Sequence, residues 1–309
     1  MYFSGTEKRY YQYSKYLRNK FQTKIYKIPL NAGFGCPNRD GTKSFGGCLF
    51  CDEAGSFSRC YDADFSIKNQ VDIAIKFLEQ RFKAKKFISY FQSYTNTYAP
   101  LDILEKTYTE AFCDDRIVGL SIGTRPDCVD KDKIKLISSF AQDKEVWIEY
   151  GLQSSSDKTL KLINRSSTFK DFVDAIEMTR GHGIKTCAHV ILGLPEETEE
   201  DILNTAKDIA HLGIDGIKLH VLCILKNTKL EKLYNEKKIF PMEEDRYVEL
   251  VCKFLELMPK NMIIERLTGN GYSLDLIGPK WLDGKFTTLT KIDNYFKEHN
   301  SCQGAKFFP

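Results

Sequence analysis

Long hydrophobic runs are absent from this sequence of 309 residues. No apolar stretch approaches the roughly 18 residues needed to cross a bilayer. Residues 1–16 are aromatic and charged, and they lack the apolar centre of a secretory signal peptide. Hydrophobic residues make up 42% of the chain and charged residues 28%, which is typical of a water-soluble globular protein. We therefore expect a cytoplasmic protein that makes no membrane contact.

Internal repeats, low-complexity tracts and a clear linker are also missing. The length suits one large α/β barrel or two ordinary domains. Six of the ten cysteines show no paired spacing, which argues against a second metal cluster, and the lack of a signal peptide makes a disulfide framework improbable. We expect most of these six to be interior thiols: Cys113, Cys128, Cys187, Cys223, Cys252 and Cys302.

Three further cysteines share one glycine-rich loop. Eleven residues separate Cys36 from Cys48, and two separate Cys48 from Cys51. The short gap lets two thiolates reach one metal centre, and the longer arm can fold back to supply a third. A structural zinc site uses four protein ligands, whereas a four-iron cluster held by three cysteines keeps one iron open. The pattern favours a cluster; a zinc site that recruits Cys60 and three unrelated structural cysteines stay as alternatives.

The net charge of +3 conceals a basic N-terminal segment. Residues 1–30 carry seven Lys or Arg against Glu7 alone, and they hold eight aromatic residues. Interleaved charges and rings suit a nucleic-acid strand, because the charges neutralise phosphates and the rings stack on bases. An amphipathic helix that packs its tyrosines on the protein is an equal and compatible interpretation.

Apolar periodicity predicts strands and helices in strict alternation. Alternation of this kind predicts an α/β fold of parallel strands joined by right-handed crossovers, either a partial barrel or a doubly wound sheet. The expected strands are 24–30, 87–91, 117–122, 146–152, 185–192 and 216–222. The expected helices are 65–82, 101–112, 131–140, 156–163, 169–181 and 199–211. Beyond them we expect a helix at 243–258, a strand at 262–267, a glycine-rich segment at 268–279 and a last helix at 286–298.

Polar and glycine-rich residues follow the predicted strands at their carboxyl ends, where α/β enzymes place their chemistry. In the sixth strand, Lys218 and His220 alternate onto one face. A buried unpaired lysine is costly, so Lys218 would need an anionic partner such as a substrate carboxylate or phosphate.

The cysteine loop, with Phe50 just before its last cysteine, resembles that of radical S-adenosylmethionine (SAM) enzymes. Its long first spacing resembles the branch that contains the catalytic subunit of Elongator and smaller bacterial relatives of the YhcC and MnmL types. The resemblance implies a partial (β/α)6 TIM-type barrel at 25–240, a basic aromatic N-terminal extension at 1–24 and a C-terminal extension at 241–309 packed on the barrel.

The same resemblance implies residue roles. Cys36, Cys48 and Cys51 would hold a [4Fe–4S] cluster whose open iron binds the amino and carboxylate groups of SAM. Gln153 would contact the SAM ribose and Arg165 the SAM carboxylate. Gln92 or Ser93 would replace the usual Gly-Gly-Glu motif that meets the SAM amino group. Further cofactor contacts are expected at Phe50, Thr124, Arg125, Ser154, His189, Gly193 and Leu194, and catalytic roles at Lys218 and His220.

The implied activity is reductive cleavage of SAM to a 5′-deoxyadenosyl radical, which removes a hydrogen atom from substrate. The branch acts on tRNA wobble uridine, so we expect processing of the 5-carboxymethylaminomethyl side chain to aminomethyl, with tRNA and an electron donor such as flavodoxin or ferredoxin as partners. No acetyltransferase-like extension is seen, so Elongator's own carboxymethylation is not expected. The alternatives are a radical reaction on a small molecule or protein, and a non-catalytic zinc protein that binds RNA.

Overall fold

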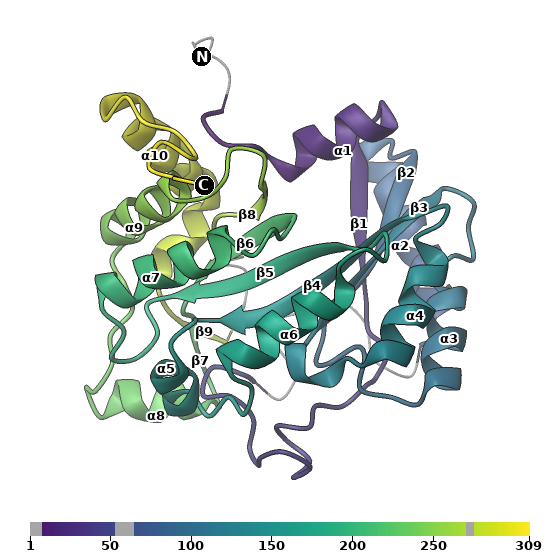
Figure 1. The fold of residues 1–309 in the computed structure, drawn as a ribbon, viewed down its shortest axis with the longest axis horizontal. Helices are drawn as coiled ribbons and strands as arrows, with labels where there is room; N and C mark the ends of the chain where they lie inside the picture. Colours follow the sequence, from purple (N-terminus) through teal and green to yellow (C-terminus); the bar gives the residue numbers. More distant parts are fainter. Residues whose placement is uncertain (1–7, 53–64, 270–274) are drawn as a thin grey trace.

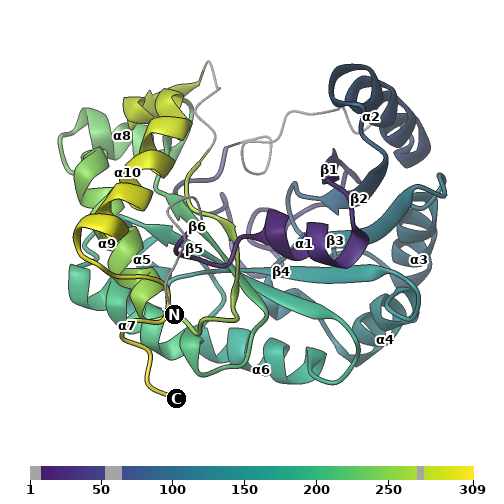
Figure 2. The ribbon, with the colours of Figure 1, turned by 90° about the horizontal axis from the view of Figure 1, so that it is seen from above.

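The computed structural model describes residues 8–52, 65–269 and 275–309. Seven parallel strands form one sheet in the order β1-β2-β3-β4-β5-β6-β8, which follows the chain. The sheet curls into an open half-barrel (Figure 2). Its strands are β1 (Ile25–Leu30), β2 (Lys86–Phe91), β3 (Ile117–Thr124), β4 (Glu145–Gln153), β5 (Lys185–Leu192), β6 (Gly216–Val221) and β8 (Ile263–Arg266).

Helices cover the convex outer side of the sheet (Figures 1 and 2). Several begin at Ser, Thr or Asp side chains that accept a backbone N–H of the first turn, as at Ser66, Asp130 and Thr198. The helices that follow β1 to β5 are α2 (Ile67–Phe82), α3 (Leu101–Glu110), α4 (Lys131–Phe140), α5 (Asp157–Leu162), α6 (Phe169–Thr179) and α7 (Glu199–Ala210). The others are α1 (Tyr13–Phe21), α8 (Lys229–Asn235), α9 (Glu244–Glu256) and α10 (Lys285–Glu298).

The two faces of the central strand β4 show how the core is divided. Ile148 and Tyr150 point outward into the apolar layer beneath the helices, where the Tyr150 hydroxyl lies 2.8 Å from the Thr179 hydroxyl of α6. Trp147 and Glu149 point inward, where they contact other elements of the barrel interior. Because side chains alternate along a strand, β4 is buried on both faces.

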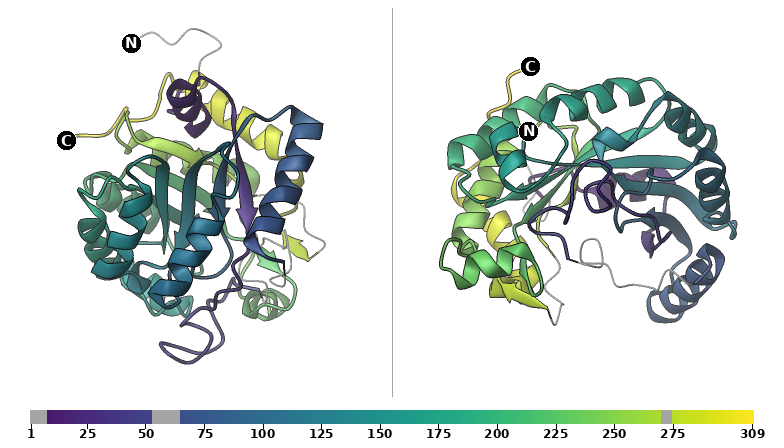
Figure 3. Two further views of the ribbon diagram at one scale, coloured as in Figure 1. Left: turned by 90° about the vertical axis from the view of Figure 1, so that its right-hand side faces the viewer. Right: turned by 90° about the horizontal axis from the view of Figure 1, so that it is seen from below.

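Helix α1 closes the base of the barrel, at the amino ends of the strands (Figures 1 and 3). Tyr13 and Tyr16 pack edge-on against Trp147, with ring centroids 5.5 and 6.1 Å away. The Tyr16 hydroxyl donates to Glu145 at 2.7 Å. The loop that carries the three cysteines lies at the opposite end of the barrel, where the strands finish (Figure 1).

These contacts support the packing interpretation of the basic N-terminal segment. Its tyrosines serve packing, and several of its charges are used internally: Lys8 pairs with Asp293, Lys20 with Glu145, and Lys27 lies inside the barrel. Helix α1 therefore lies at the opposite end of the barrel from the cysteine loop, and it gives no support to a nucleic-acid interface at the site (Figure 1). Tyr2, Phe3 and Glu7 lie outside the described residues.

The sheet contains one strand more than the six expected in the barrel, because β8 pairs in parallel with β6. Sequence analysis identified this strand but assigned it to the C-terminal extension. The sequential strand order excludes the doubly wound alternative. A small antiparallel pair, β7 (Ile224–Leu225) with β9 (Leu276–Gly278), and helix α8 were not predicted. None of the described helices is long and apolar enough to span a membrane.

Candidate active site

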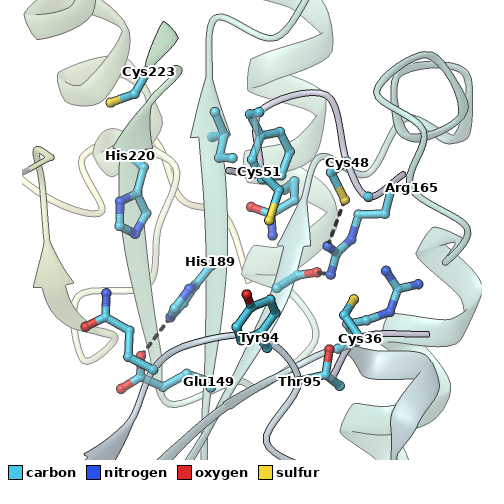
Figure 4. A pocket seen from close by; sticks show the side chains of 18 of the residues that line it. Cys36, Cys48, Cys51, Tyr94, Thr95, Glu149, Arg165, His189, His220 and Cys223 are labelled. Carbon is cyan, nitrogen blue, oxygen red and sulfur yellow. Dashed lines mark hydrogen bonds and ion pairs between the residues drawn. The ribbon is translucent and has the colours of Figure 1, made fainter. Parts of the chain in front are cut away.

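A cavity opens at the carboxyl ends of the strands, and the three cysteines of the loop line one side of it (Figure 4). The Cys48 sulfur lies 3.7 Å from an Arg165 nitrogen, and the Cys51 sulfur 3.6 Å from an Arg39 nitrogen. Each of these two sulfurs therefore lies beside a guanidinium group. The arrangement predicted for Cys36, Cys48 and Cys51 is therefore present around one cavity.

The three cysteines suit a cluster better than a single ion. Among the residues described, no three His, Cys, Asp or Glu side chains are close enough to share one metal ion. In a four-iron cluster each cysteine binds a different iron, so the sulfurs need only surround a common space. Cys60, the fourth ligand of the alternative zinc site, lies outside the described residues.

The end of β4 forms a polar cradle next to the cysteines. Gln153 adopts a left-handed conformation with φ of 76° at a β-bulge, and its side chain faces the cavity. A Cβ at Gly151 would lie 2.7 Å from the Gln153 amide nitrogen and 2.9 Å from an Arg165 nitrogen. Any larger residue would displace these two polar groups, so glycine is required for the cradle to keep its shape.

Unsatisfied donors in this cradle fit the carboxylate and ribose of SAM. Arg165 Nε and Arg125 Nη1 are buried and have no hydrogen-bond partner in the described chain, and the Thr95 hydroxyl is in the same condition. A guanidinium binds a carboxylate through paired N–H groups, and the Gln153 amide can bond two hydroxyls. The orphaned atoms mean that the residues present fit the expected cofactor.

A charged clamp fixes the end of β3 to the cysteine loop. Arg125 donates to both oxygens of Asp127 at 2.9 and 2.8 Å, and Lys43 of the loop reaches the same carboxylate at 2.7 Å. Although burial opposes it, contact with Arg125 and Lys43 lowers the pKa of Asp127 to about 2. Asp127 therefore positions Arg125.

Beneath the cavity lies a layer of buried charges centred on Glu149. Lys27 of β1 donates to one Glu149 oxygen at 2.7 Å, while Lys218 of β6 and His189 Nε2, at 2.8 Å, contact the other. Burial opposes ionisation, but the two lysines hold the pKa of Glu149 well below its usual range. Glu265 of β8 accepts from Lys27 at 2.8 Å and lies 3.5 Å from Lys218.

This layer corrects the reasoning about Lys218. The lysine is buried, as expected, but its anionic partner is Glu149 of the protein itself. Its charge is already compensated, so it does not need a substrate carboxylate, and the cavity is not lined by it.

The two histidines predicted for the site lie side by side on the cavity wall, with ring centroids 5.6 Å apart (Figure 4). Burial and the charge of Lys218 lower the pKa of His189 despite its contact with Glu149. Burial, followed by the charge of Arg266, holds the pKa of His220 well below its usual range. Both imidazoles are therefore neutral near pH 7.

The structure brings most of the predicted site residues together and leaves five aside. Those lining the cavity are Cys36, Cys48, Phe50, Cys51, Gln92, Thr124, Arg125, Gln153, Arg165, His189 and His220. Those outside its lining are Ser93, Ser154, Gly193, Leu194 and Lys218.

The predicted site residues that lie outside the cavity lining make structural contacts instead. The Ser154 hydroxyl donates to Glu197 at 2.6 Å and joins the end of β4 to the start of α7. Leu194 is buried in an apolar cluster with Leu160 and Leu222, and a Cβ at Gly193 would meet the Met242 side chain at 2.9 Å. Their expected contacts with cofactor are not supported by these positions.

Sequence reasoning missed other lining residues, among them Arg39, Tyr90, Glu149, Cys223 and Arg266. Glu149 could have been found from the sequence. It is the single carboxylate in the apolar strand predicted at 146–152, and it lies four residues before Gln153, so both side chains are expected on the same face of the strand. Cys223 was expected to be an ordinary thiol, and Cys113 is exposed, whereas Cys128, Cys187 and Cys252 are buried as expected.

Comparison with known families agrees with this geometry. Residues 30–209 match the sequence profile of the Radical SAM superfamily, and residues 214–298 match that of the Radical_SAM C-terminal domain. The YtqA protein of Bacillus subtilis (strain 168), itself uncharacterized, is 39% identical over 99% of this chain and 95% of its own length. The YhcC protein of Escherichia coli (strain K12) is 35% identical over 95% of both chains.

More distant relatives share part of the chain. The tRNA uridine(34) acetyltransferase of Dehalococcoides mccartyi (strain CBDB1) is 28% identical over 49% of this chain and 33% of its own length. The solved structure of Elp3 from Methanocaldococcus infernus, with an N-terminal deletion, has a TM-score of 0.66. It covers 90% of this chain and 64% of that chain at 16% identity, so it shows the fold alone. These matches confirm the predicted partial barrel.

Proposed function

Because the chain belongs to the radical SAM superfamily, we propose that it is an enzyme that modifies the wobble uridine of tRNA and converts a 5-carboxymethylaminomethyl side chain to aminomethyl. A [4Fe–4S] cluster and SAM are its cofactors, and when bound and reduced they supply a 5′-deoxyadenosyl radical for hydrogen-atom removal. The observation that carries the tRNA assignment is the relation, across half the chain, to a protein named for tRNA uridine(34).

The chain's own residues would prepare the site for this chemistry. Cys36, Cys48 and Cys51 would hold the cluster, while Arg165 and Gln153 would hold SAM at the end of β4. The Asp127 clamp keeps Arg125 facing the same space. Phe50, together with Ile191 of β5, adds an apolar wall that keeps water from the reacting atoms.

A positive rim beside the cavity supports an RNA substrate. Lys226 and Lys229 are exposed, and neither makes an ion pair with a described residue. The Lys229 ammonium lies next to Gly46 of the cysteine loop. The start of α8 is joined to the loop through the backbone bond from Leu230 to Leu49 at 3.3 Å. Phosphates bound here would bring a flipped-out base toward the cavity.

The direct test is an anaerobic assay on tRNA that carries 5-carboxymethylaminomethyluridine. The reconstituted enzyme, with SAM and a reductant, should convert this nucleoside to the aminomethyl form, as measured by mass spectrometry of digested tRNA. Formation of 5′-deoxyadenosine should rise with added substrate tRNA. Unchanged tRNA, with 5′-deoxyadenosine formed equally with and without it, would refute the assignment.

A further inference from the structure

One guanidinium in the barrel interior has no bonding partner among the described residues. In the buried layer, Lys27 and Lys218 are balanced by Glu149 and Glu265. Arg266 of β8 lines the cavity directly beyond this layer. Within residues 8–52, 65–269 and 275–309, it has no hydrogen-bond or ion-pair partner.

A β-bulge in β8 explains why Arg266 faces the cavity. Ile217 pairs with Ile264 and Lys218 pairs with Arg266, so Glu265 is an extra residue in the ladder. In a regular strand, neighbouring residues would point to opposite faces, but a bulge turns the chain locally. The Glu265 carboxylate can therefore bond Lys27 while the next side chain, Arg266, also points inward.

Each of the other three arginines of the cavity is held by at least one hydrogen bond to the protein, although Arg125 and Arg165 keep free donors that are expected to bind SAM. Arg39 donates to the Asp52 carbonyl and lies beside Cys51. Arg125 donates to both carboxylate oxygens of Asp127. Arg165 donates to the Gly151 carbonyl. Among the described lining residues Glu149 is the sole carboxylate, and it receives two lysines. The cavity consequently has an excess of positive charge on Arg39, Arg165 and Arg266, and of these three Arg266 is the one for which the described residues provide no hydrogen bond.

The place of Arg266 separates it from the predicted cofactor groups. Arg165 lies next to Cys48, whereas Arg266 is on the edge strand at the other end of the sheet from β1, with His220 as its neighbour. His220 is neutral because burial and the charge of Arg266 both lower its pKa. A neutral imidazole leaves the guanidinium as the local charge that an anion would meet.

We propose that Arg266 binds the carboxylate of the substrate side chain, and this inference rests on the proposed function. A guanidinium fork matches a carboxylate in shape and charge. In the 5-carboxymethylaminomethyl group, the carboxylate is attached to the methylene carbon that leaves with it. This carbon would lose a hydrogen atom to the deoxyadenosyl radical, then an electron to the cluster and a proton to water. Addition of water to the resulting C=N bond would release the two carbons as glyoxylate and leave the aminomethyl group. Holding the carboxylate at Arg266 orients the methylene carbon in the cavity and selects tRNA that still carries the acid over the product.

Binding can be tested without turnover, using the reconstituted enzyme with SAM but no reductant. Three anticodon stem-loops serve as probes, carrying carboxymethylaminomethyluridine, aminomethyluridine or plain uridine. Wild type should bind the first about 10- to 100-fold more tightly than the second, which is the range for hydrogen bonds to a charged group. Arg266→Met should abolish this preference, and Arg266→Lys should keep part of it.

Matched controls separate the possible outcomes. Arg18→Met, on the exposed side of α1 at the far end, should retain full selectivity. Arg266→Met should bind SAM as wild type does and should not lower the melting temperature, because no partner is left unpaired. Equal weakening of all three probes would mean that Arg266 contacts a backbone phosphate, and this would overturn the inference.

The failure of this inference is distinguishable from that of the proposed function. If wild type converts the substrate tRNA and Arg266→Met retains full selectivity among the probes, only the role of Arg266 is wrong. If wild type neither prefers nor converts the acid-bearing tRNA, the proposed function fails and the inference falls with it.

Discussion

The carboxylate of Glu149 balances the charges on which the interior of the barrel depends. It receives Lys27, Lys218 and His189 from three other strands. Removing one partner from a buried ionic network leaves the remaining charges uncompensated. We therefore expect Glu149→Gln to lower the free energy of unfolding by about 3 kcal/mol, measured by urea denaturation.

Two further variants test whether uncompensated buried charge causes the loss of stability. Glu177→Gln removes an exposed partner of Arg180 and should change stability by less than about 0.5 kcal/mol. Adding Lys218→Met to Glu149→Gln should restore part of the loss, because the charge left unpaired is removed as well. A Glu149→Gln protein as stable as wild type would show that the layer is not balanced as described.

Glu197 should make stability depend on pH near neutrality. Burial raises the pKa of Glu197 to about 7, although the hydrogen bond from Ser154 opposes the shift. The folded protein then binds a proton more tightly than the unfolded chain, so this group costs stability as pH rises from about 4.5 to about 7. Glu197→Gln stays neutral and can still accept from Ser154.

The expected result is a stability gain for Glu197→Gln that grows with pH. The difference in free energy of unfolding between the variant and wild type should increase by about 2 kcal/mol from about pH 5 to about pH 8. Urea denaturation at several pH values measures this difference. If the free energy of unfolding varies with pH in the same way for the two proteins, the pKa of Glu197 is not raised in the folded state.

Residues that sequence analysis found and missed differ in a physical way. Cys36, Cys48 and Gln153 were identified because their spacing or strand-end position is local in sequence. Arg266 was missed because its orientation depends on a bulge, and that bulge appears only when β8 pairs with β6. Lys218 was located correctly, but its partner Glu149 comes from a strand about seventy residues earlier.

At the scale of elements, α1 and α8 lie at opposite ends of the barrel (Figure 1). If tRNA binds on the cavity side, α8 and its preceding loop can contact phosphates there, whereas α1 cannot. Lys226→Glu with Lys229→Glu should weaken tRNA binding about 10-fold. It should also reduce the slope of log affinity against log salt concentration by the amount expected for the loss of one to two phosphate contacts. Filter binding at several salt concentrations measures both.

A double charge reversal on α1 is the matched control. Lys15→Glu with Arg18→Glu changes the net charge equally, on residues exposed at the base of the barrel. It should leave tRNA affinity within about twofold of wild type once long-range attraction is screened by salt. A larger loss from the α1 variant than from the α8 variant would place RNA at the base instead.

Elements with strong periodicity were predictable, and short ones were not. The helix predicted at 131–140 and the strand at 185–192 coincide with α4 and β5. The two-residue strand β7 carries no periodic signal, and its pairing with β9 depends on contact across fifty residues of chain. Helix α8 is only seven residues long, so its pattern was too short to identify.

For the whole molecule, strict alternation of strands and helices predicted a parallel α/β fold, and the resemblance to radical SAM enzymes favoured the partial barrel over a doubly wound sheet. Sequence could not show that a seventh strand joins the sheet, nor that the N-terminal helix closes its base. Both depend on tertiary contacts, as when Tyr13 meets Trp147 at 5.5 Å. The result is a barrel with an apolar base, a charged middle layer and a cavity at the strand ends.

The central claim is that the cysteine loop holds a [4Fe–4S] cluster that acts on SAM. The most direct measurement is anaerobic reconstitution with iron and sulfide, followed by an absorption spectrum and an assay of 5′-deoxyadenosine after SAM and dithionite are added. Wild type and Cys113→Ala, which alters an exposed cysteine away from the cavity, should be brown and form 5′-deoxyadenosine. Cys48→Ala should lose both properties. A colourless wild type that carries one tightly bound zinc and forms no 5′-deoxyadenosine would contradict the claim.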